Sequence, residues 1–206
     1  MAPDKYKNFA ELEQSEKEDE DYTLFYRELG SELVIMAPHG GGIEPGTIDI
    51  ADALAGCDYT FYAFKGLKKT GNKTLHISSN TFDEALGVKA SQNALIAISI
   101  HGSKDRTEMV HIGGKHEVLK QKIRDALNAS GFHAELTDLP GLRGISPENI
   151  CNRCKSGKGV QLEIPRGLRE KLFDQLDHRL LRKKTILFYQ FVNTLREVLL
   201  IFKGQL

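Results

Sequence analysis

Short apolar runs, separated by polar and glycine-rich segments, recur along most of the chain and predict a β-sheet. Six runs predict strands, at 32–37, 59–64, 74–78, 94–100, 132–137 and 159–164. Several of the first four do not alternate between apolar and polar positions, which is typical of strands that are buried on both faces. The last two alternate between apolar and polar positions, so we expect them nearer an edge or a wetter face of the sheet.

Segments with apolar residues at helical spacing lie between and after these runs. They predict helices at 47–55, 82–92, 115–130, 148–154 and 184–202. The last helix should lay one apolar face on the body of the domain. That face consists of Phe188, Phe191, Val192, Leu195, Val198, Leu199 and Phe202. Alternation of strands and helices favours an α/β fold with a mixed β-sheet flanked by helices, and ligands of such sheets bind beyond the carboxyl ends of strands.

Length and charge narrow the picture further. A chain of 206 residues fits one domain, and no linker or repeat divides residues 1–206. The 28 basic and 28 acidic residues cancel, so no general electrostatic attraction favours nucleic acid or an anionic membrane. We therefore expect neither as a partner, and we expect a monomer. Residues 1–21 end in an acidic run and predict a surface segment that is partly flexible.

Other features bear on the compartment. Three cysteines are too few for a disulfide framework and suit a reducing environment. Cys151 and Cys154 form a C-x-x-C pair, which we interpret as two small packing residues because no second pair accompanies it. The N-terminus lacks the apolar region of a secretion signal, and the last helix carries charges that exclude a membrane span. We expect synthesis in the cytoplasm without a signal peptide. Release by host lysis, followed by action outside the cell, is compatible with the same sequence, because lysis requires no signal peptide.

Residues with metal-binding chemistry stand at the ends of three predicted strands. His39 leaves the first strand before three glycines and Glu44, and His101 leaves the fourth before Gly102. Glu163 lies in the last predicted strand. Two histidines and one carboxylate are the protein ligands of many catalytic zinc sites, where a further carboxylate can act as base. A histidine at a strand end can also be a packing residue, and a helix dipole favours glutamate near its start, so the residues alone leave both interpretations open.

Four motifs in this order resemble those of the phage and bacillus poly-γ-glutamate hydrolases. They are P-H-G-G-G-I-E-P-G-T, T-L-H-I-S-S-N-T-F-D-E, I-S-I-H-G and N-I-C-N-R-C-K-S-G-K-G-V-Q-L-E-I. The resemblance covers residues from about 20 to about 165 and implies a fold similar to that of zinc carboxypeptidases. It also implies hydrolysis of γ-glutamyl amide bonds in an anionic polymer, poly-γ-glutamate, by a phage or prophage product that degrades a host capsule.

The resemblance also implies roles for individual residues. It makes His39, Glu44 and His101 the zinc ligands and Glu163 the general base and acid. One departure is that zinc carboxypeptidases place the glutamate three residues after the first histidine, whereas the interval here is five. We expect the glycines to provide a different path to the metal.

Substrate binding is the second implication of the resemblance. Asn152 and Arg153 correspond to the pair with which carboxypeptidases hold a substrate carboxylate, and a guanidinium suits the α-carboxylates of poly-γ-glutamate. His76 is a further candidate for the pocket. No clear match exists for the carboxypeptidase arginine that stabilises the oxyanion, so Lys65 or His76 are the candidates. The alternatives are a zinc amidase acting on other γ-glutamyl or cell-wall peptides, and a phage replication-associated binding protein without activity.

Overall fold

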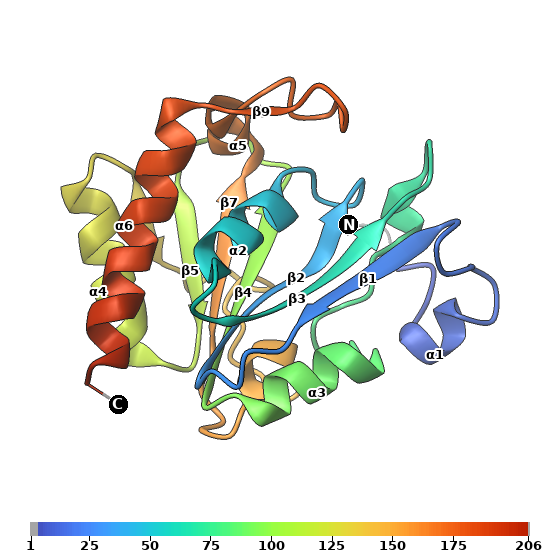
Figure 1. The fold of residues 1–206 in the computed structure, drawn as a ribbon, viewed down its shortest axis with the longest axis horizontal. Helices are drawn as coiled ribbons and strands as arrows, with labels where there is room; N and C mark the ends of the chain where they lie inside the picture. Colours follow the sequence, from blue (N-terminus) through green and yellow to red (C-terminus); the bar gives the residue numbers. More distant parts are fainter. Residues whose placement is uncertain (1–3, 206) are drawn as a thin grey trace.

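A mixed seven-stranded sheet forms the centre of the computed structural model, which describes residues 4–205 (Figure 1). Its strand order is β1-β3-β2-β4-β7-β5-β6. The strands are β1 (Tyr22–Arg27), β2 (Leu33–Gly41), β3 (Thr60–Gly66), β4 (Ile96–Ser103), β5 (Val110–Gly114), β6 (Ala134–Leu136) and β7 (Val160–Pro165). Strands β3, β2, β4 and β7 run parallel, whereas β1 and β5 pair antiparallel with their inner neighbours. The expected α/β fold with a mixed sheet is confirmed.

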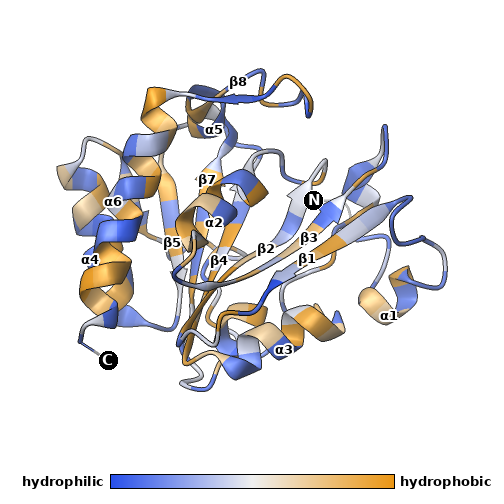
Figure 2. Ribbon diagram, in the orientation of Figure 1, coloured by the Kyte–Doolittle hydropathy of each residue, from blue (hydrophilic) through white to orange (hydrophobic). Residues whose placement is uncertain are grey.

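Helices cover both faces of this sheet and divide the interior into two cores. One face packs against four helices: α2 (Thr47–Ala55), α4 (Glu117–Ala129), α5 (Arg166–Leu172) and α6 (Ile186–Lys203). The other packs against α1 (Phe9–Leu12), α3 (Ala85–Asn93) and the 3-10 helix η2 (Ile150–Arg153). Figure 2 shows hydrophobic and hydrophilic residues mixed along α4 and α6. All seven apolar residues expected on one face of the last helix are buried.

Most predicted elements are present, with some differences at particular segments. The run 74–78 is not a strand, because its start lies in the 3-10 helix η1 (Asn72–Leu75) and the rest is irregular. The predicted helix at 148–154 is a single 3-10 turn, η2. Strands β1 and β5 and helix α5 were not predicted, and a short hairpin of β8 (Phe173–Asp174) and β9 (Lys183–Lys184) was also missed.

The acidic N-terminal segment lies at the surface over its described part, with most of its residues exposed, and three buried residues attach it to the domain. Tyr6, Leu12 and Glu16 are buried. The Glu16 carboxylate accepts a hydrogen bond from the Tyr6 hydroxyl and pairs with the ammonium groups of Lys5 and Lys68. Burial alone would raise the pKa of Glu16, but these hydrogen bonds outweigh it and hold the pKa at about 2. Lys68 lies just after β3, so this cluster attaches the segment to the sheet.

Replacing Glu16 with glutamine should therefore destabilise the protein in a pH-dependent way. Because the pKa in the folded state, about 2, is below the ordinary 4.5, the stabilisation is fully present above pH 4.5 and is lost as the pH falls toward 2. We expect Glu16→Gln to lower the free energy of unfolding by about 1–3 kcal/mol at pH 7 and by less at pH 3. Urea unfolding at several pH values measures this, with exposed Glu13→Gln as the control. A loss that is equal at every pH would contradict the assignment.

Within residues 4–205, the structure has no helix that combines the length and apolar character needed to cross a membrane.

Candidate metal centre

An irregularity in β2 directs His39 to its position. Alternate residues of β2 up to Ala37 face the core beneath α2, and a regular strand would send His39 to the same side. The pairing of β2 with β3 shifts register between Ala37 and Gly40. Such a shift changes the face to which later side chains point. His39 therefore lies on the opposite face, near Ile77 and Phe82, where His101 also points.

The two imidazoles meet through their Nδ1 atoms. His39 Nδ1 and His101 Nδ1 lie 3.1 Å apart, and both residues are buried. His39 Nε2 lies 2.7 Å from the carbonyl oxygen of Ile77. A proton on Nε2 donated to this carbonyl leaves Nδ1 free as a ligand, an arrangement that typically orients metal-binding histidines. His101 Nε2 is buried and has no hydrogen-bond partner within residues 4–205.

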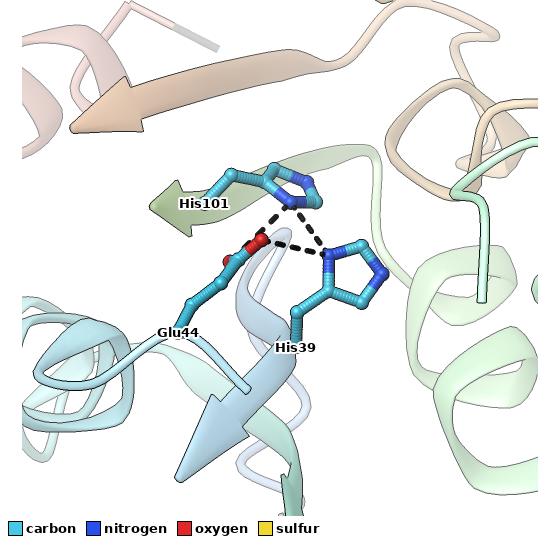
Figure 3. A group of neighbouring side chains, drawn as sticks. All are labelled: His39, Glu44 and His101. Atoms are coloured by element: carbon cyan, nitrogen blue, oxygen red, sulfur yellow. Dashed lines mark hydrogen bonds and ion pairs between the residues drawn. The ribbon is translucent and has the colours of Figure 1, made fainter. Parts of the chain in front are cut away.

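Glu44 completes the cluster from the loop after β2 (Figure 3). Its Oε1 lies 3.4 Å from His39 Nδ1, and its Oε2 lies 4.0 Å from His101 Nδ1. The backbone N–H of Gly102 donates a 2.8 Å hydrogen bond to Oε2 and orients the carboxylate. The expected grouping of His39, Glu44 and His101 is therefore present in space, with one ligand atom from each within 4.8 Å of the others.

The glycine loop makes the five-residue interval between His39 and Glu44 possible. Gly41 has a φ of 68°, and a Cβ there would lie 2.5 Å from the carbonyl oxygen of Gly66. The loop thus passes directly against the end of β3, which only glycine permits. A hydrogen bond of 2.9 Å from the Glu44 N–H to the His39 carbonyl closes the turn and returns the carboxylate to the imidazole.

The spacing and chemistry of this donor set fit a zinc ion. Two ligands at zinc bond lengths in a tetrahedral site are separated by about 3.3–3.4 Å. The separations from His39 Nδ1 to His101 Nδ1 and to Glu44 Oε1, 3.1 and 3.4 Å, are close to that value. Neutral imidazole and carboxylate are also ligands that zinc accepts without a redox change. His39, Glu44 and His101 would therefore hold the metal, with a fourth position left for water or substrate.

The protonation of the cluster is compatible with this interpretation. Burial, reinforced by His39, lowers the pKa of His101 to about 3, so its imidazole is neutral at physiological pH. Burial would also lower the pKa of His39, but the Glu44 carboxylate outweighs it and raises that pKa. In turn His39 outweighs the effect of burial on Glu44 and lowers the pKa of the carboxyl. Because a ligating imidazole must be unprotonated, metal affinity should fall as acid protonates His39.

Glu163 stands beside the cluster on the neighbouring strand. In the parallel pairing of β4 with β7, Glu163 is the register partner of His101, so both side chains point to the same face. The side-chain amide of Gln161 donates to Glu163 Oε1 at 3.3 Å. Burial and the neighbouring Glu44 carboxylate raise the pKa of Glu163 to about 8. A carboxyl group with a pKa close to neutral can both accept and return a proton, as a general base and acid must.

Two residues near the cluster were not expected there from the sequence. His111 of β5 is the register partner of Glu163 on its other side, in a segment for which no strand was predicted. Asp4 accepts from His76 Nδ1 at 2.8 Å. The His76 ring in turn lies 4.1 Å from that of His39, so the structure does bring His76 into the site. The contact with Asp4 spans 72 positions and leaves no local signal in the sequence.

The pair Asn152 and Arg153 is occupied with backbone contacts. The Asn152 side chain is buried, donates to the carbonyls of Gly144 and Ser146, and accepts from the Gly159 N–H. These bonds use both of its donor hydrogens, so the expected contact of Asn152 with a substrate carboxylate does not match the structure. Cys151 is fully buried and Cys154 is nearly so, in agreement with their interpretation as packing residues.

Arg153 is bound less completely than its neighbour. Its guanidinium donates to three carbonyls, those of Glu148, Asn80 and Phe82. These bonds attach η2 to the loop that follows Ile77, and they leave two of the five N–H groups of an arginine for another partner. A substrate role for Arg153 stays a prediction.

Lys65 does not reach the cluster, which corrects one of the two candidates for oxyanion stabilisation. It lies on β3, on the same side as Phe61 and Ala63, which belong to the core beneath α2. Its ammonium group lies 5.3 Å from the centre of the Phe25 ring. The metal cluster is on the other face of the sheet. His76 is the remaining candidate.

Comparison with known proteins gives matches over nearly the whole chain. The family model described as poly-gamma-glutamate hydrolase matches residues 6–194. The protein YmaC of Bacillus subtilis (strain 168) is 38% identical over 200 residues, which are 96% of this chain and 84% of YmaC.

Two solved structures also superimpose closely on this one. A bacteriophage poly-gamma-glutamate hydrolase has a TM-score of 0.93 at 33% identity, covering 99% of this chain and 100% of its own. A zinc-free structure of YndL, a protein of Bacillus subtilis (strain 168), has a TM-score of 0.89 at 37% identity, covering 96% of this chain and 98% of its own.

Proposed function

This chain belongs to the poly-γ-glutamate hydrolase family, and from that premise we propose that it is a zinc-dependent enzyme that cleaves the γ-glutamyl amide bonds of this polymer. The observation that carries the proposal is the convergence of His39, Glu44 and His101, with Glu163 beside them. The solved structure of YndL is described as zinc-free, and this mention of zinc for a relative supports the choice of metal. Zinc fits the spacing of the donor atoms described above.

In the proposed reaction some residues bind the metal, and others transfer protons or orient the groups that do so. The chemistry that zinc supplies at such a site is to acidify water and to polarise a carbonyl oxygen. Glu163 accepts the proton of the attacking water and delivers it to the amine that leaves. The Gln161 amide holds the Glu163 carboxylate in place, while the Gly102 N–H holds that of Glu44. His76 is our candidate for a further substrate contact, because Asp4 orients its ring beside that of His39.

The polymer carries an α-carboxylate on every residue, so the site should also offer cationic donors. Arg153 is our candidate, because two of its N–H groups are free of the three carbonyls that it binds. We leave Asn152 out of this role, since its amide is committed to the backbone.

The proposal predicts that the purified protein shortens poly-γ-glutamate only when a metal is bound. Size-exclusion chromatography with light scattering should show a falling polymer mass over time. Treatment with a chelator should stop the reaction, because His39, Glu44 and His101 would lose their ion, and addition of zinc should restore it. Metal analysis of the active protein should find about one zinc per chain, the stoichiometry of a site with one set of protein ligands.

Two results would redirect this assignment. If the polymer stays intact while short γ-glutamyl or cell-wall peptides are cleaved, the enzyme is a zinc amidase with a different substrate. Full activity in protein that holds no divalent metal would exclude zinc chemistry at this site. A matched reaction with α-linked polyglutamate is the control for the linkage, and it should leave that polymer uncut.

A further inference from the structure

A buried arginine on α5 lies where the segments that carry the site residues come together. Arg169 is only 3% exposed. Its Nε donates to the carbonyl of Ile164 at 3.0 Å, and its Nη1 and Nη2 donate to those of Pro45 and Ser103, each at 2.6 Å. One side chain therefore binds one loop and the ends of two strands, and Pro45 and Ser103 are 124 and 66 positions away from it in the sequence.

Each of the three acceptors is next to, or near, a residue of the candidate centre. Pro45 follows Glu44, Ile164 follows Glu163, and Ser103 is two positions after His101. A guanidinium is planar, and its N–H groups point in fixed directions, so it sets the positions of its acceptors relative to one another. Arg169 thereby links the loop after β2 to the ends of β4 and β7, which together supply two metal ligands and the proposed base.

Gly102 shows how closely the guanidinium approaches the centre. A Cβ on Gly102 would lie 2.7 Å from Arg169 Cζ, so the absence of a side chain lets the guanidinium pack against this peptide. The N–H of the same residue donates to Glu44 Oε2. Arg169 thus packs against the Gly102 peptide, and the N–H of that peptide orients a metal-binding carboxylate.

The charge of Arg169 is not explained by an ion pair. Within residues 4–205 no carboxylate lies within ion-pair distance of it, although Glu44 and Glu163 are near enough to stabilise the charge electrostatically. A buried charge costs desolvation energy that an apolar side chain would avoid. What the guanidinium supplies in return is three directed hydrogen bonds to the segments of the site.

We propose that Arg169 is a positioning residue that holds the segments of Glu44, His101 and Glu163 in the arrangement that binds the metal and presents the base. The inference rests on the proposed zinc site and goes beyond it. Outer-shell partners of this kind typically change metal affinity by about 10–100-fold when they are removed. The effect should thus be measurable without any substrate.

The test compares Arg169→Gln and Arg169→Lys with the original protein in zinc affinity, cobalt spectrum and melting temperature. Competition with a chromophoric chelator should show zinc affinity reduced by about 10–100-fold in Arg169→Gln. The visible spectrum of the cobalt-substituted variant should also change, because the ligand geometry is altered. Arg169→Lys keeps the charge but not the planar fork, so its affinity should lie between the two.

A matched control is Arg196 on α6, which also donates to main-chain carbonyls, those of Ala53 and Leu54, but away from the centre. Arg196→Gln should lower the melting temperature and leave zinc affinity and the cobalt spectrum unchanged. If Arg169→Gln does not fold, Gly102→Ala provides a second route, since it displaces the guanidinium from the other side. We expect it to weaken zinc binding as well.

The possible failures can be told apart. Zinc affinity and a cobalt spectrum in Arg169→Gln that match the original protein would overturn the positioning role, whatever the melting temperature. If zinc binding weakens in Arg169→Gln but the original protein, with zinc bound, does not cut poly-γ-glutamate, the positioning role is supported and the proposed substrate is overturned.

Discussion

Replacing Glu163 with glutamine should reduce kcat on poly-γ-glutamate by about 10²–10⁴-fold, the range that a positioned general base contributes. Glutamine has nearly the same shape but cannot accept the proton of the attacking water. Zinc content should be unchanged, because the cluster that binds the metal consists of His39, Glu44 and His101. KM should change little, since the side chain acts on the reaction and not on distant parts of the polymer.

The fold of this variant should be intact. Burial and Glu44 raise the pKa of Glu163 to about 8, because both disfavour its charged form, so the site should accommodate a neutral glutamine of nearly the same shape. Glutamine is neutral at every pH and can retain the contact with Gln161. Melting temperature and zinc analysis verify this, and Glu197→Gln on the exposed face of α6 is the control for loss of a carboxylate elsewhere. Near-normal turnover by Glu163→Gln would remove this residue from the mechanism.

The central part of the site follows from local sequence patterns and one rule of sheet geometry. The apolar runs of β2 and β4 are long enough to be read as buried strands, and β2, β4 and β7 each carry a polar residue near the carboxyl end. The alternation in β7 suggested an edge or a wetter face, but this strand lies between β4 and β5 and is largely buried. Parallel neighbouring strands bring these carboxyl ends to one edge of the sheet. His39, His101 and Glu163 could therefore be expected to converge, although the register shift that turns His39 to the correct face could not be foreseen.

Short elements were harder to predict because tertiary contacts decide them. Residues 74–78 alternate like a strand, but Leu75 and Ile77 are buried in the core beneath α3 without any strand partner. Strand β5 ends in two glycines, a residue type that is common in turns. In the structure a Cβ on Gly113 would lie 2.5 Å from the Leu142 carbonyl oxygen, so this glycine serves close approach within a strand. Propensity alone does not distinguish these cases.

Residues that act through distant contacts had no readable signal. Arg169 binds carbonyls of segments far away in the chain, and nothing in its neighbourhood on α5 marks it as different from other helix arginines. Asn152 shows the opposite error. Its motif suggested a substrate contact, whereas the fold uses its amide to bind Gly144, Ser146 and Gly159. A side-chain amide is equally suited to either partner, so only the three-dimensional surroundings decide between them.

Replacing His101 with alanine should abolish tight zinc binding and, with it, activity. Loss of one of three protein ligands should reduce zinc affinity by more than the ~100-fold upper range that is typical for outer-shell partners. Chelator competition measures the affinity, and polymer size measures the activity. His133→Ala, which removes an exposed histidine outside the cluster, should leave both unchanged.

The environment of His101 separates a metal ligand from a structural histidine. Its imidazole is buried, burial lowers its pKa to about 3, and Nε2 has no hydrogen-bond partner within residues 4–205. A histidine kept for packing would be expected to satisfy both nitrogens, because unpaired buried polar atoms are costly. His101 has only His39 opposite Nδ1 and the more distant Glu44. Nδ1, which faces His39 and Glu44, is therefore better explained by a metal ion than by packing, whereas the unpaired Nε2 is not a ligand atom of this cluster.

Thermal unfolding with and without zinc tests whether His101 is a metal ligand or a structural histidine. A ligand that binds only the folded state stabilises it by about 2.7 kcal/mol at a free concentration 100 times its Kd. Zinc should raise the melting temperature of the original protein and of His133→Ala by the same amount, and that of His101→Ala hardly at all. In the presence of a chelator, His101→Ala should unfold close to the original protein. If it is instead strongly destabilised there while still responding to zinc, His101 is a structural residue and the metal site must be built without it.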